Sequence, residues 1–141
     1  MERGQVFQEE IKQNESVFSG LRLEIKNANL ILLSEGEDKL GTLAIAVPQK
    51  EKMLGTPVSA IILGDRNMIV ARLLAESLAQ RTGKLALASV YAKAITEKDA
   101  GSIFLKLFEK TLKAKEKREK KKSVSRDEKK LRNRRKSPRS I

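Results

Sequence analysis

Residues 55–91 constrain the fold of this chain most, because they predict a strand, a helix and a second strand joined by short connections. The run Val58–Leu63 is apolar and rich in β-branched residues, which is typical of a buried strand. Pro57 stands just before that run, where a residue without an N–H group loses no ladder hydrogen bond. Residues 85–90 predict the second strand, with side chains alternating over its two faces.

The helix between these strands is predicted from its boundary residues and its periodicity. Gly64 ends the first strand, and Asp65 is expected to be the N-cap, because its carboxylate can accept hydrogen bonds from the free N–H groups of the first turn. Gly83 is expected at the C-terminal end, where a residue without Cβ takes the left-handed conformation at low cost. One apolar stripe is predicted along the helix: Ile69, Val70, Leu73, Leu74 and Leu78.

Strands are also predicted before this block. Apolar and polar residues alternate in 21–26, with Arg22, Glu24 and Lys26 on a solvated face. Residues 30–33 are apolar at every position, so both faces of that strand should be covered. The remaining expectations are strands at 5–12 and 42–47, a turn region at 14–20, and hairpin connections at 27–29 and 34–40.

A second helix is predicted after Thr96, which begins a pattern resembling a capping box with Asp99 in the fourth position. Phe104 and Phe108 repeat at helical spacing and predict an apolar face that ends near Leu112 or Ala114. Residues 115–122 are compatible with an exposed helical extension, and disorder is expected from Ser123 onward. We therefore expect a globular domain at 1–114 and a basic C-terminal extension at 115–141.

Together these elements predict an α+β fold, with a mainly antiparallel sheet of about six strands flanked by two helices. Two amphipathic helices can cover one face of that sheet. The other face then needs a second layer, and a partner subunit is the simplest one, so we expect a homodimer. The candidate residues of this dimer face are Leu30, Ile31, Leu32, Leu33, Ile61 and Ile62.

The same central block resembles a known family. Its motifs are Pro57-Val58-Ser59, Leu63-Gly64-Asp65 and the run from Leu78 to Lys84, in that order. This ordered set resembles the small proteasome assembly chaperones, of the third- and fourth-subunit type and their archaeal homologues, over roughly residues 20–112. The resemblance implies an α+β subunit that works as a dimer without a cofactor. It also implies that the partners are proteasome α-subunits or a second chaperone-like protein.

Composition argues against an enzyme. The chain has no His and no Cys, which removes the commonest general base and metal ligand as well as any thiolate site. Ser59 has no His to activate it, and the loop acids Glu35, Glu37 and Asp38 match no calcium loop. No apolar run approaches the ~20 residues that cross a bilayer. We expect a cytoplasmic, non-enzymatic protein without membrane contact, metal or cofactor. The Lys, Arg and Glu content is typical of a thermophile.

The net charge of +12 is concentrated in the C-terminal extension, where residues 115–141 hold 14 Lys or Arg against 4 Asp or Glu, a net of +10. Three interpretations remain open. The extension can bind nucleic-acid phosphates without sequence preference, which is the alternative function, since it has no aromatic residue to read bases. It can equally be a solvated segment, or an arm that docks on an acidic protein. The candidate partner-binding residues are Lys120, Lys121, Lys122, Arg132, Arg134, Arg135 and Lys136.

Overall fold

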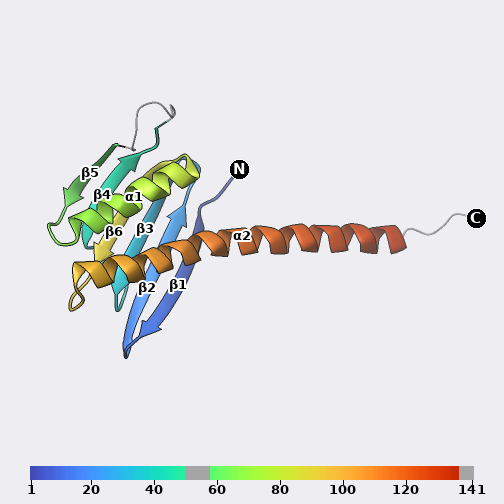
Figure 1. Ribbon diagram of the computed structural model, residues 1–141. Helices are drawn as coiled ribbons and strands as arrows, with labels where there is room; N and C mark the ends of the chain where they lie inside the picture. Colours follow the sequence, from blue (N-terminus) through green and yellow to red (C-terminus); the bar gives the residue numbers. More distant parts are fainter. Residues whose placement is uncertain (50–57, 137–141) are drawn as a thin grey trace, which may run out of the picture. The chain divides into compact units, whose positions relative to one another are not determined.

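The computed structural model describes the backbone of residues 1–49 and 58–136, and the side chains of those residues up to 132. Pro57 lies outside the described residues. The chain separates into two compact units, Met1–Thr111 and Leu112–Ile141. The predicted α+β fold with six strands and two helices is confirmed (Figure 1). The elements are β1 (Gln5–Gln13), β2 (Ser16–Glu24), β3 (Ala28–Glu35), β4 (Thr42–Val47), β5 (Val58–Leu63), α1 (Met68–Thr82), β6 (Leu85–Tyr91) and α2 (Glu97–Lys136).

The six strands form one mixed sheet in the order β1-β2-β3-β6-β4-β5. The pairs β1–β2, β2–β3, β4–β5 and β4–β6 are antiparallel, and only β3–β6 is parallel. The expectation of a mainly antiparallel sheet is therefore confirmed. Strand β6 is the last in sequence but lies in the middle of the sheet, between β3 and β4.

Both helices of the first unit, α1 and the part of α2 up to Thr111, pack on the same face of the sheet (Figure 1). Phe104 and Phe108 of α2 are fully buried there. The rings of Phe104 and Phe18 of β2 meet edge to face with centroids 6.1 Å apart, a favourable geometry for aromatic pairs. This face, which we call the covered face, holds the core of the unit.

Helix α1 turns a different stripe to the core than its leucine and isoleucine spacing predicts. Ile69 is 66% exposed and Leu73 is 59% exposed, so the predicted stripe is wrong at both positions. The buried positions are Val70, Ala71, Leu74, Ala75, Leu78 and Ala79. The alanines face small residues on the sheet, since Ala44, Ala46, Ala86 and Ala88 are all fully buried. Small side chains on both layers allow a close helix–sheet approach, and this outweighs the burial of larger residues.

The first hairpin is tighter than the predicted turn region at 14–20. Strand β2 already begins at Ser16, and the turn consists of Asn14 and Glu15 alone, with φ of 50° and 67°. Positive φ at both central residues matches the right-handed twist of the flanking strands. The prediction was wrong because the polar residues after the turn belong to a strand. Its inward side chains include Phe18, which is 1% exposed.

The start of α1 also differs from the prediction. The helix begins at Met68, after Asn67 in the left-handed region, and no side chain caps it. Asp65 is exposed and is not the N-cap. Gly64 makes the turn possible with φ of 90°, and a Cβ there would lie 2.6 Å from Thr42 Oγ1. Gly83 has the conformation expected of it, with φ of 68° and its N–H donating to the Ala79 carbonyl at 2.9 Å.

Helix α2 begins as the sequence predicts and extends further. The Asp99 N–H donates to Thr96 Oγ1 at 3.3 Å, as in a capping box. Disorder was expected from Ser123 onward, but the helix continues to Lys136, and residues 137–141 lie outside the described residues. Lys, Arg and Glu are good helix formers, and neither Gly nor Pro interrupts residues 102–136. Pairs such as Glu116 and Lys120 at i, i+4 add further support.

Candidate assembly interface

The face of the sheet opposite the two helices carries mostly aliphatic side chains across its centre. Strand register places six side chains in one row across all six strands: Val6, Leu23, Leu30, Leu87, Ile45 and Ala60. A second row contains Gln8, Leu21, Leu32, Ser89, Leu43 and Leu63. We call these two rows the open face. None of their residues is charged. With strands about 4.8 Å apart, each row is about 24 Å long.

Nothing among residues 1–49 and 58–111 is layered over the open face, because both helices of this unit lie on the other side (Figure 1). Leu21 and Leu32 are cross-strand neighbours, as are Leu23 and Leu30, and all four side chains are only half-buried. At the sheet edges Val6 is 47% exposed and Leu63 is 46% exposed. A contiguous apolar surface of this extent on a folded unit typically marks an interaction site.

The predicted dimer-face residues are divided between the two faces. Leu30 and Leu32 lie on the open face, whereas Ile31 and Leu33 are fully buried on the covered face and are not accessible to a partner. Ile61 pairs with the buried Ala44 and so belongs to the covered face. Ile62 is 54% exposed on the opposite side. The prediction treated each apolar run as one unit, although neighbouring side chains of a strand point in opposite directions.

The polar side of β2 is buried, which reverses the expectation of a solvated face. Arg22 is fully buried and Glu24 is 7% exposed on the covered face, while Leu21 and Leu23 lie on the open face. Sequence reasoning missed the open-face leucines of β2 for this reason. The alternation of Leu21 and Leu23 with charged residues could have identified these leucines. It would have required the interpretation that Arg22 and Glu24 are the buried residues of the strand.

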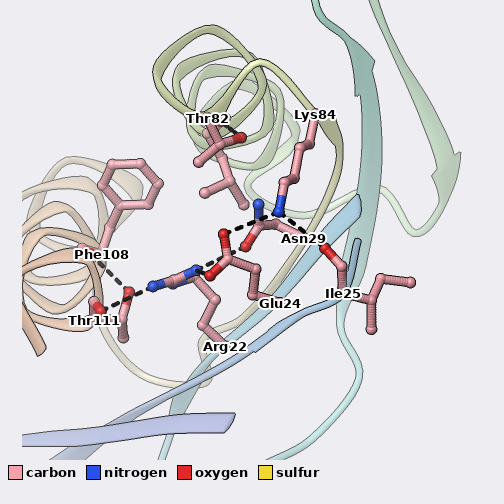
Figure 2. Close-up of polar contacts among 9 residues, drawn as sticks. Arg22, Glu24, Ile25, Asn29, Thr82, Lys84, Phe108 and Thr111 are labelled. Atoms are coloured by element: carbon pink, nitrogen blue, oxygen red, sulfur yellow. Dashed lines mark hydrogen bonds and ion pairs between the residues drawn. The ribbon is translucent and has the colours of Figure 1, made fainter. Parts of the chain in front are cut away.

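Figure 2 shows how the covered face accommodates Arg22. Its Nη1 donates to Asn29 Oδ1 at 2.7 Å, and its Nη2 donates to the Thr111 carbonyl of α2 at 3.1 Å. The same Nη1 lies 3.7 Å from Glu24 Oε2. The guanidinium carbon is 4.6 Å from the centroid of the Phe7 ring, within cation–π range. One arginine thus ties β1, β2 and β3 to α2.

Lys84 completes this polar cluster from the end of α1 (Figure 2). Its Nζ lies 3.3 Å from Glu24 Oε1 and donates to the Ile25 carbonyl at 3.0 Å. Buried charges are tolerated when they are paired and hydrogen-bonded. The charges of Arg22 and Glu24 on β2 are thus satisfied beneath the helices, on the side of the strand opposite Leu21 and Leu23.

The tail candidates belong to the second unit. Lys120, Lys121, Lys122 and Arg132 are exposed on α2. Arg134, Arg135 and Lys136 are part of the helix, but their side chains lie outside the described ones.

Two further features bear on catalysis and metal binding, namely a pocket and the placement of the acidic side chains. A pocket of about 300 Å³ next to Gly64 is lined by Asp65, Arg66, Tyr91 and Lys93 among others. Its lining thus includes one carboxylate, that of Asp65, and two cationic side chains, those of Arg66 and Lys93. Within residues 1–49 and 58–136, no group of three or more His, Cys, Asp or Glu is positioned to hold a metal ion. In the same residues no helix has the length and apolar character needed to cross a membrane.

The fold is similar to that of a chain in the crystal structure of a chaperone complex for yeast 20S proteasome assembly. The TM-score is 0.58, the match covers 81% of this chain and 96% of that chain, and the sequence identity is 12%. No protein-family profile and no curated protein matches the sequence. The α+β fold of this chain is therefore similar to the fold of a chain in that chaperone complex.

Proposed function

We propose that this chain is a non-enzymatic protein-assembly factor of the proteasome-chaperone type, which acts as a dimer formed through its open face. The observation that carries the proposal is the distribution of side chains on β2. Arg22 is inside and Leu21 and Leu23 are outside, so the leucine side is suited to burial against another protein rather than to water.

A second copy of the chain is the natural partner for this surface. A two-fold axis through the open face places the same rows on each other, and neither row contains a charged side chain. The similarity to a chain of a chaperone complex supports an assembly role. The further partners are then proteasome α-subunits or a second chaperone-like protein, bound without a cofactor.

Light scattering on the full-length chain tests the dimer. The wild type is expected at twice the mass of one chain. Leu30→Lys places a charge in the centre of the open face and should give the mass of one chain at the same concentration. Leu73→Lys is the matched control, because Leu73 is 59% exposed on the outer surface of α1. A monomeric wild type, or a dimer broken by Leu73→Lys and not by Leu30→Lys, would refute the interface.

The assembly role is tested separately with purified proteasome α-subunits. Native mass spectrometry should detect a complex of the chain with these subunits in the presence of EDTA and without nucleotide. If the dimer forms and no complex with α-subunits does, the proteasome part of the proposal is wrong and the interface stands.

A further inference from the structure

The second unit presents a helix whose charges are unevenly distributed around its axis. Residues 112–136 hold 14 Lys or Arg and 4 Asp or Glu. With 3.6 residues per turn, one arc of about 140° contains no acidic residue between Leu112 and Arg132. We call the exposed part of this arc the basic face: Arg118, Lys121, Lys122, Ser125, Arg126, Lys129 and Arg132. The acidic residues Glu116, Glu119, Asp127 and Glu128 all lie outside it.

From this arrangement we propose that the basic face binds the phosphate backbone of duplex nucleic acid without sequence preference. Lys122, Arg126 and Lys129 follow one another at four and three residues, which corresponds to rises of about 6.0 and 4.5 Å along the axis. An α-helix of about 10–12 Å diameter fits the major groove of B-form DNA, which is about 12 Å wide. Cationic side chains on one side of such a helix reach phosphates along the groove wall.

The composition of the basic face favours phosphates over an acidic protein. Helices that dock on proteins use apolar or aromatic anchors, which supply most of the binding energy. The basic face has none, because Ser125 is its only uncharged member. Phosphate binding needs only positive charge, since the release of condensed counterions provides the free energy.

An anionic membrane surface and single-stranded nucleic acid fit the basic face less well than a duplex does. An interfacial membrane helix needs a continuous apolar face, and the exposed apolar residues in the described part of the second unit are Val124 and Leu131. Single-stranded nucleic acid is usually held by aromatic stacking, and no aromatic residue follows Phe108. Binding to duplex phosphates requires only cationic side chains, and the basic face provides them.

Fluorescence anisotropy of a labelled 20-base-pair duplex with the full-length chain, from 50 to 200 mM NaCl, tests this proposal. The face variant is Lys121→Gln/Lys122→Gln/Arg126→Gln/Lys129→Gln. The control variant Lys113→Gln/Lys117→Gln/Lys120→Gln/Lys130→Gln removes the same charge from outside the basic face. Glutamine is a good helix former, and equal ellipticity at 222 nm in both variants verifies that the helix is retained.

The wild type should bind duplexes of unrelated sequence equally. Each lost phosphate contact lowers the slope of log affinity against log salt by about 0.9, so the face variant should lose about 3 to 4 units of slope. The control should lose at least tenfold less affinity than the face variant at 100 mM NaCl. Equal losses in the two variants would reduce the effect to net charge and overturn the proposal. Wild-type binding that is undetectable at 100 mM NaCl, or tighter binding to phosphatidylserine vesicles or to polyglutamate, would also overturn it.

Discussion

Replacement of the buried Arg22 by Met tests whether one arginine holds the covered face together. Methionine has a similar length and fills the space, so the change mainly removes charge and hydrogen bonds. Asn29 Oδ1 and the Thr111 carbonyl lose their donors, at 2.7 and 3.1 Å. Glu24, which is 7% exposed, retains its ion pair with Lys84 but loses the one with Arg22.

The expected loss follows from these contacts. Removing one partner of a buried ion pair costs about 3–5 kcal/mol, because the other charge remains buried. A domain the size of Met1–Thr111 has a total stability of about 6–17 kcal/mol, so Arg22→Met should still fold. At about 4 °C per kcal/mol, its Tm should fall by about 12–20 °C. Thermal unfolding followed by circular dichroism measures this shift.

Two variants make the test specific. Arg72→Met is the control, because Arg72 is exposed and its Nε donates to Ser59 Oγ at 3.1 Å, so its loss should stay below about 1 kcal/mol. Adding Glu24→Gln to Arg22→Met removes the buried carboxylate that has lost Arg22 as a partner, and should recover about 1–3 kcal/mol. The reasoning is refuted if Arg22→Met costs no more than Arg72→Met, or if the two cluster substitutions are simply additive.

Two pairs of substitutions test the covered face and the turn before α1. Leu74→Ala should lower the free energy of unfolding in urea by about 2–5 kcal/mol because Leu74 is 4% exposed, whereas Leu73→Ala should change it by less than about 0.5 kcal/mol. Equal losses would mean that α1 is rotated from the orientation described. Gly64→Ala should cost about 1–3 kcal/mol more than Gly36→Ala, since both glycines have φ near 90° but only the Cβ at Gly64 would collide with Thr42. Similar melting temperatures for these two variants would contradict the close approach of Thr42.

The sequence predicted the strands of this chain better than the directions of their side chains. β4 and β5 begin and end where alternation and apolar runs place them, and the Thr96 start of α2 follows from capping chemistry. These signals are local, so they can be read from neighbouring residues. The tight turn at Asn14 and Glu15 was not predicted, because neither residue is glycine although both adopt positive φ.

The wrong predictions of which side chains are buried on β2, β3 and α1 have a common physical origin. Which face of a strand is buried depends on distant layers, and a charged residue such as Arg22 can be inside when Asn29, Glu24 and Thr111 satisfy it. In the same way, the buried side of α1 contains alanines, which fit the small buried residues Ala44 and Ala88 of the sheet. Ile69 and Leu73 are exposed instead. The need for a second layer over the sheet was inferred from the apolar runs at 30–33 and 60–63, but which of their residues face that layer depends on the strand register.

The central position of β6 sets an order of events during synthesis. Strands β1 to β3 and strands β4 to β5 can each form as hairpins, yet no pairing joins the two groups except through β6. The aliphatic row is interrupted between Leu30 and Ile45 until Leu87 is inserted. A nascent chain that ends before β6 therefore has the open face in two separate parts. The aliphatic row becomes continuous only after β6 has been synthesised and has paired with both β3 and β4.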